Sequence, residues 1–255
     1  MEKKLQGLRR FNIFMGFLHF IQAMAVLFIS DPNKGVMPVT VNYLSFDIAT
    51  KKLLPAFEKV ADINLAWFVV GFFLLSSFAH FFIATFYRKN YEKGLLEGIN
   101  KIRWIEYALS ASVMMVAISF LSGIYDLSSL IMIFSLDAIM NLLGYAMEDH
   151  NRKAEKLNWF TYILGCFAGI MPWIVFGIYV FASSQFGGGN IPSFVYWIYV
   201  SIFIFFNSFA VNMILQYKKV GPWKDYLYGE RVYIILSLVA KTLLAWQVFG
   251  GTLRP

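Results

Sequence analysis

The sequence is poor in charge and in cysteine. Only 15% of its 255 residues are Asp, Glu, Lys or Arg, whereas 59% are hydrophobic. A soluble domain of this length carries nearer to a quarter charged residues. The single cysteine, Cys166, excludes an intrachain disulfide and a cysteine metal cluster, and we expect it to be a small buried side chain. The composition therefore predicts a membrane protein rather than a soluble one.

The sequence also lacks an internal repeat, a low-complexity tract and a linker to a second domain. We therefore expect one domain over residues 1–255. No cleavable signal sequence is expected, because the first apolar segment is about long enough to span a membrane and no small-residue cleavage site follows it. The net charge of +7 does not indicate nucleic-acid binding, because the basic residues lie in short loops between apolar segments.

Seven apolar segments are present, and each approaches or exceeds the roughly twenty residues that cross a bilayer as a helix. The fold class expected is an all-α membrane protein, a bundle of seven transmembrane helices. The segments are residues 11–29, 62–87, 99–121, 124–147, 157–182, 191–216 and 230–250.

The distribution of lysine and arginine predicts the orientation of this bundle. Of the 22 basic residues, 16 fall in the amino-terminal tail and in the second–third, fourth–fifth and sixth–seventh connections, whereas 5 fall on the other side. The remaining one is Lys241. Cytoplasmic loops carry the excess of positive charge. We therefore expect a multi-pass protein of the cell membrane, with a cytoplasmic amino terminus and an extracellular carboxyl terminus.

One external connection, residues 30–61, is long. Residues 39–46 alternate well enough for a β-strand, and residues 31–35 before them have the composition of a turn. We expect a small external β-hairpin here; the alternative is an irregular loop.

Lys241 lies in the last apolar segment, about ten residues from the nearest charge. At about 1.5 Å per helical residue this is roughly 15 Å deep, near the middle of a hydrocarbon core about 30 Å thick. A desolvated lysine avoids the cost of a buried charge by losing its proton, and a neutral amine is a nucleophile toward aldehydes. The position suggests a Schiff base with retinal. The alternative is a lysine that snorkels or pairs with a buried acid.

Four ionisable residues fall between the cytoplasmic surface and the bilayer centre: His19, His80, Glu106 and Lys241. A lone histidine is more often structural, and a glutamate near a helix end is usually solvated, but four such groups at compatible depth predict a shared polar cavity. Ser237 shares a helix face with Lys241, and Ser110 shares one with Glu106, because each pair is four residues apart. Glu106 is the best counterion available for a protonated Schiff base.

The external half of the bundle lacks comparable groups. Asp137, about thirteen residues into the fourth segment, is the one deep acid there. A proton pump needs titratable groups that reach both surfaces. Their absence argues against pumping, although water and serines can also relay protons.

Aromatic residues make up 19% of the chain and can build the flat apolar walls of a polyene pocket. Each candidate taken alone is more often a packing residue. The candidates are Met114, Met140, Gly144, Trp173, Phe206 and Met213.

Two motifs resemble those of the heliorhodopsins. They are residues 103–107, Arg-Trp-Ile-Glu-Tyr, and residues 237–246, which begin at Ser237 and contain Lys241. The inverted topology, the long first external connection and the basic amino terminus are also similar, so that the resemblance covers essentially the whole chain. It implies that Lys241 binds all-trans retinal and that Glu106 is the counterion. His19, His80 and Ser237 would line the adjoining polar cavity, and Tyr107 belongs to the same motif as Glu106.

The function expected from the residues and the resemblance together is that of a dimeric light-sensing photoreceptor, not an enzyme. Light would isomerise all-trans retinal to 13-cis, and the Schiff-base proton would move transiently toward Glu106, His19 and His80 without net ion pumping. The alternatives are a light-driven or light-gated ion transporter, and a retinal-free membrane protein in which Lys241 pairs with Glu106. A cytoplasmic signalling partner is left open.

Overall fold

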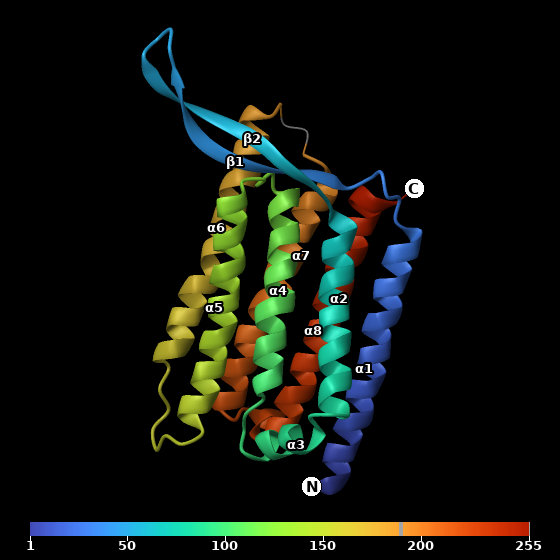
Figure 1. The fold of residues 1–255 in the computed structure, drawn as a ribbon. Helices are drawn as coiled ribbons and strands as arrows, with labels where there is room; N and C mark the ends of the chain where they lie inside the picture. The colour runs from blue at the N-terminus through green and yellow to red at the C-terminus, as the bar shows by residue number, and fades with distance from the viewer. Residues whose placement is uncertain (189–190, 255) are drawn as a thin grey trace.

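The computed structural model describes residues 1–188 and 191–254, which form a bundle of long helices with a β-hairpin at one end (Figure 1). Seven helices in these ranges are long and apolar enough to cross a membrane. The expected seven-helix class with an added hairpin is confirmed. The spanning helices are α1 (Glu2–Ile29), α2 (Leu65–Ala84), α4 (Lys101–Leu121), α5 (Leu127–Asn151), α6 (Phe160–Phe186), α7 (Ser193–Tyr217) and α8 (Tyr226–Val248), the last extended by a π-helical turn (Phe249–Leu253).

Two short helices were not expected from the sequence. Helix α3 (Arg88–Leu96) lies across the end of the bundle that holds the amino terminus (Figure 1), and a 3₁₀ turn (Gly221–Lys224) precedes α8. Helix α3 is amphipathic and only 9 residues long, so it adds no apolar segment of spanning length. The end of the bundle with α3 is called the amino-terminal end below, and the opposite end is called the hairpin end.

The hairpin consists of β1 (Val36–Asp47) and β2 (Lys52–Asn64), which pair antiparallel from Val36 opposite Asn64 to Asp47 opposite Lys52. Both strands are longer than the alternation in residues 39–46 predicts. Strand β2 continues to Asn64, so α2 begins at Leu65 rather than at residue 62. The alternative of an irregular loop is wrong.

The loop before α5 holds the hairpin against the bundle. Thr40 N donates to the carbonyl of Tyr125 at 2.9 Å, and Asn42 N donates to Asp126 Oδ1 at 3.3 Å. Asp126 also caps α5 by accepting from Ser129 N. A hydrogen bond from the Ser128 hydroxyl is the main cause that holds the pKa of Asp126 below its ordinary value.

The two halves of the bundle have different interiors. The hairpin half is filled by one large apolar cluster, in which Phe72, Phe120, Phe176 and Leu244 are fully or almost fully buried. Apart from the mid-depth Asp137, the buried charged and histidine side chains of the described residues lie toward the amino-terminal end or near Lys241. Most of the buried charged and histidine side chains therefore lie in the amino-terminal half of the bundle.

Candidate functional site

Lys241 of α8 forms a buried ion pair with Glu106 of α4. The Nζ atom of Lys241 lies 3.2 Å from Glu106 Oε1 and 2.8 Å from Ser237 Oγ. The lysine side chain is 3% exposed and that of Glu106 is 8% exposed. Glu106 Oε1 also accepts hydrogen bonds of 2.6 Å from Ser76 and Ser110. These donors compensate part of the cost of burying the carboxylate.

The two expected histidines lie beside this pair. The rings of His19 and His80 stack with centroids 5.4 Å apart and planes inclined by 12°. His80 Nδ1 is 2.8 Å from Asn12 Oδ1. Neither ring nitrogen of His19 has a hydrogen-bond partner within the part of the chain that the structure describes. A cavity of about 30 Å³, large enough for a water molecule, is lined by His80, Glu106 and Ser237.

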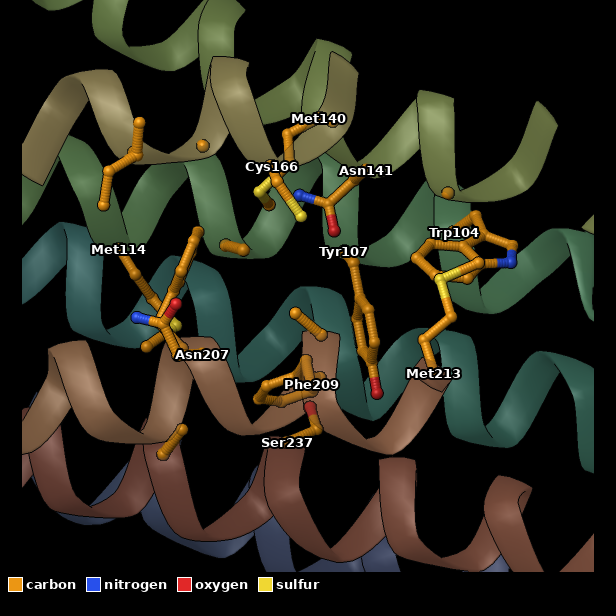
Figure 2. Close-up of a pocket in the computed structure, with 18 of the residues that line it drawn as sticks. Trp104, Tyr107, Met114, Met140, Asn141, Cys166, Asn207, Phe209, Met213 and Ser237 are labelled. Carbon is orange, nitrogen blue, oxygen red and sulfur yellow. The ribbon is translucent and has the colours of Figure 1, made fainter. Parts of the chain in front are cut away.

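A much larger cavity, of about 310 Å³, is lined by Lys241 and by other residues of α4, α5, α6, α7 and α8 (Figure 2). Its size falls within the range of small-molecule sites. Of the thirteen candidate site residues named from the sequence, nine line it: Tyr107, Met114, Met140, Gly144, Trp173, Phe206, Met213, Ser237 and Lys241. Four do not. Glu106 and His80 line the small cavity, Ser110 donates to Glu106, and His19 stacks on His80.

The walls of the large cavity are aromatic and tightly positioned. Trp173 packs edge-on against Tyr199, Phe203 and Phe206, with centroids 5.3–5.7 Å apart. Gly144 is needed where α5 approaches α4, since a Cβ there would come within 2.6 Å of Cη2 of Trp104. A flat apolar molecule in the cavity would therefore lie against closely packed aromatic side chains.

The sequence did not identify several polar groups in this lining, among them Asn141, Thr161 and Asn207. Cys166 also lines the cavity and is exposed, so the expectation that it is buried is wrong. Its segment is apolar, and an apolar pattern does not say which helix face points to lipid or to a cavity.

Asp137 is fully buried at the contact of α4 with α5. Its Oδ2 accepts from Ser112 Oγ at 3.0 Å and from Asn141 Nδ2 at 3.2 Å. Its Oδ1 has no partner among the described residues. Asn141 connects Asp137 to the wall of the large cavity.

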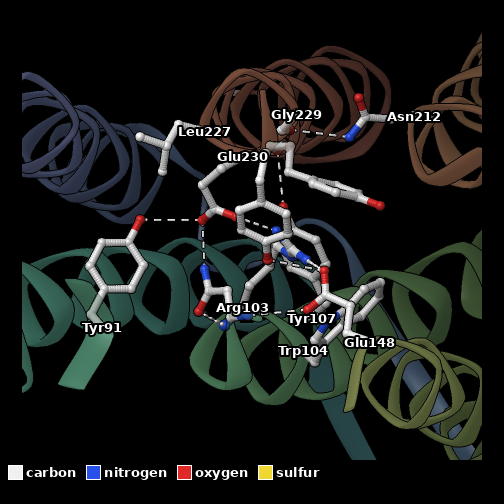
Figure 3. A network of polar contacts seen from close by, with 12 residues as sticks. Tyr91, Arg103, Trp104, Tyr107, Glu148, Asn212, Leu227, Gly229 and Glu230 are labelled. Atoms are coloured by element: carbon white, nitrogen blue, oxygen red, sulfur yellow. Dashed lines mark hydrogen bonds and ion pairs between the residues drawn. The ribbon is translucent and has the colours of Figure 1, made fainter. Parts of the chain in front are cut away.

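A second buried charge cluster, missed by the sequence reading, lies nearer the amino-terminal end (Figure 3). Arg103 of α4 pairs with Glu148 of α5 and with Glu230 of α8. Its side chain is 3% exposed and those of both glutamates are 1% exposed. The 16 basic residues assigned to the tail and connections include Arg103, in the second–third connection. This placement is wrong, because Arg103 is buried in α4, and 15 such residues remain.

Neighbouring side chains complete this Arg103 cluster. Glu148 accepts from Trp104 Nε1 at 2.7 Å and from the Tyr226 hydroxyl at 3.1 Å. Glu230 accepts from Asn100 Nδ2 at 2.6 Å and from the Tyr91 hydroxyl at 3.3 Å. Charges near the ends of apolar segments are usually solvated, so the positions of these residues in the sequence do not predict that they are buried. The available signal was two acids, Glu148 and Glu230, at the same segment ends as Arg103.

The comparisons with known proteins decide the family. The family model described as Heliorhodopsin matches residues 8–253. The chain belongs to the heliorhodopsin family. Heliorhodopsins are retinal photoreceptors rather than enzymes, so membership implies a retinal chromophore in this membrane protein. No curated protein sequence matches the chain.

Solved microbial rhodopsins share the fold at low sequence identity. A cyanorhodopsin from the cyanobacterium Tolypothrix sp. NIES-4075 superposes with a TM-score of 0.65 at 11% identity, covering 96% of this chain and 94% of that one. The light-driven proton pump LR (Mac) from Leptosphaeria maculans gives 0.63 at 14% identity, covering 97% and 95%. These likenesses establish the rhodopsin-like fold and nothing about transport.

The residues present fit a heliorhodopsin chromophore. The large cavity is mainly apolar and aromatic, as a polyene requires, and Lys241 is one of its lining residues. The Lys241 amine is the deepest lysine nitrogen of the described chain and is paired with a carboxylate. The site thus combines an amine, a carboxylate paired with it and an apolar cavity, which are the groups that attachment of retinal needs.

Proposed function

We propose that the protein is a light sensor in which retinal is attached to Lys241 and no net ion transport follows absorption. The observation that carries this proposal is the buried pair of Lys241 with Glu106, in which Lys241 also lines the large cavity. Bound retinal supplies the absorption of visible light and the isomerisation, which we infer starts from the all-trans form.

Glu106 is the counterion in this proposal. A positive charge on Lys241 Nζ is expensive in the middle of a membrane, and the carboxylate at 3.2 Å offsets that cost. The hydroxyls of Ser76 and Ser110 donate to the same Oε1 atom and hold it in place. Ser237 Oγ accepts from Nζ and adds a neutral partner.

The proton released from Nζ after absorption has a short route into the amino-terminal half. Glu106 and His80 line the same small cavity, and a water molecule there would connect them. His80 Nδ1 faces Asn12, and His19 stacks on its ring. We infer that Glu106 and the two histidines hold the proton until it returns to Nζ.

The hairpin half offers no matching route. The side chains that fill it are apolar, apart from buried serines such as Ser119 and Ser122. Asp137 is the outermost buried acid of the described residues. A charge moving through this half would meet the barrier that makes intramembrane charges rare. The proton therefore returns to Lys241 Nζ from the amino-terminal half.

The excess of lysine and arginine at the amino-terminal end supports a cytoplasmic location for that end. The polar half of the bundle, with α3 and the Arg103 cluster, then faces the cytoplasm. The homodimer implied by the family resemblance and a cytoplasmic signalling partner both stay predictions.

The test is light-induced pH change in a lightly buffered suspension of cells that express the protein with retinal. We expect no steady pH shift under continuous light, with or without a protonophore. The Lys241→Ala variant is the matched control, because it has no attachment site. A steady shift that the protonophore abolishes and the variant lacks would contradict the sensor and establish the transporter alternative.

A further inference from the structure

A third cavity, of about 270 Å³, lies at the amino-terminal end between α3, the start of α4 and the end of α5. It is separate from the cavity that would hold retinal and shares none of its lining residues. It is called the α3 cavity here. Its charged lining residues are Lys93, Glu97, Lys101 and Arg152, and its amide groups come from Asn90 and Asn100.

The charge balance of the α3 cavity favours an anion. Three of its four charged lining residues are cationic. Arg152 is already paired with Glu97 at 2.8 Å and with Asp149 at 3.0 Å, and Lys93 lies 4.0 Å from Glu97. Lys101 is the first residue of α4, whose amino-terminal end adds partial positive charge. The excess of positive charge that an anion would meet therefore comes from Lys93 and Lys101.

The donors come from several directions, which suits a phosphate group better than a single carboxylate. Lys93 projects from α3, Lys101 from α4 and Arg152 from the end of α5. A phosphate has three strong acceptor oxygens that can meet such donors at once. The asparagine side chain of Asn90, which is exposed on α3, is a neutral donor in the same lining.

One lining residue, Tyr91, connects the α3 cavity to the candidate chromophore site. Tyr91 lines the cavity and hydrogen-bonds at 3.3 Å to both Glu230 Oε1 and Asn12 Nδ2. Asn12 in turn lies 2.8 Å from His80 Nδ1. Two side chains, Tyr91 and Asn12, therefore separate the cavity from the proposed proton acceptor.

We propose that the α3 cavity binds a phosphate group, carried either by a small soluble phosphate ester or by the headgroup of an anionic lipid. We further propose that its occupant alters the return of the proton through Tyr91 and Asn12. Binding is independent of the proposed function, whereas the effect on the proton rests on it.

Binding is tested on the retinal-free protein in nanodiscs of phosphatidylcholine, titrated with inorganic pyrophosphate in a calorimeter. The Lys93→Gln/Lys101→Gln variant should raise Kd by about tenfold or more, which is about 1.4 kcal/mol. The control is Lys89→Gln/Lys153→Gln, which removes the same charge from exposed lysines at this end that do not line the cavity. The control should bind as the parent does.

A second arm replaces pyrophosphate with phosphatidic acid mixed into the nanodiscs, with bound lipid counted by native mass spectrometry. Selective loss of bound lipid in the Lys93/Lys101 variant, without pyrophosphate binding by the parent, would assign the phosphate to a lipid. Equal behaviour of parent and Lys93/Lys101 variant toward both probes would overturn the site.

The effect on the proton is tested on the retinal-bound protein. The probe that binds should change the rate at which the visible band recovers after a flash in the parent but not in the Lys93/Lys101 variant. If the probe binds but the rate of recovery of the visible band does not change, the proposed effect of the occupant on proton return is wrong. Since the calorimetry needs no retinal, a failed chromophore assignment would leave the binding result standing.

Discussion

Lys241 Nζ lies 3.2 Å from Glu106 Oε1, although the two residues are 135 positions apart in the chain. Their helices, α8 and α4, bring an amine and a carboxylate together inside the bundle, away from water. A buried pair of this kind is costly to break, because the remaining charge has no solvent to stabilise it. The Arg103 cluster, nearer the amino-terminal end, holds further buried pairs of this kind.

Replacing Glu106 with Gln should change the colour of the pigment. The variant removes the negative charge beside Nζ while keeping a side chain of similar shape, so the absorption maximum should move to longer wavelength. The visible band should also be lost at a lower pH than in the parent. The measurement is a pH titration of the absorption spectrum.

Glu58→Gln, on the exposed β2 strand, is the control for that titration. It should leave both colour and titration unchanged. If Glu106→Gln gives the parent's colour and titration, Glu106 is not the principal counterion, and Asp137 becomes the acid to test.

Replacing Arg103 with Gln should destabilise the protein strongly. It leaves Glu148 and Glu230 buried without their cation, and breaking a buried pair in this way costs about 3–5 kcal/mol. The expected result is a large fall in the thermal unfolding midpoint in detergent.

Arg152→Gln is the comparison for Arg103→Gln, because Arg152 pairs with Glu97 and Asp149 near the surface. Such pairs contribute about 0–1 kcal/mol, so this variant should unfold close to the parent. Equal midpoints for both variants would show that the Arg103 cluster does not stabilise the bundle.

The amino terminus should be cytoplasmic and the carboxyl terminus extracellular, because 15 basic residues lie at the amino-terminal end and 5 at the hairpin end when the buried Arg103 is left out. A protease-cleavable tag at each end, in intact cells, checks this. Protease should remove the carboxyl-terminal tag alone. Removal of the amino-terminal tag alone would reverse the topology and place the Arg103 cluster outside.

Much of the fold could be predicted from the sequence, because spanning helices are marked by long apolar segments. The hairpin was foreseen from the alternation in residues 39–46, but its length was not, since pairing continues through the polar residues as far as Asn64. Helix α3 was missed because a short amphipathic helix at a membrane surface has no spanning signal.

Some residues of the candidate site could likewise be predicted from the sequence, and others could not. Lys241 stands out because a lone lysine deep in an apolar segment is rare. Arg103, Glu148 and Glu230 were missed because each lies near a segment end, where a charge is usually solvated. Tyr91 of α3 and Asn100 just before α4 donate to Glu230, and only the packing of the chain reveals these contacts.

The most direct test of the account is the absorption spectrum of the protein expressed with all-trans retinal, compared between the parent, Lys241→Ala and Lys218→Ala. Lys218 follows α7 outside the bundle and serves as the control. We expect a visible band in the parent and in Lys218→Ala, and a folded protein without that band in Lys241→Ala. A visible band in Lys241→Ala that survives denaturation as a covalent adduct would contradict the assignment of Lys241.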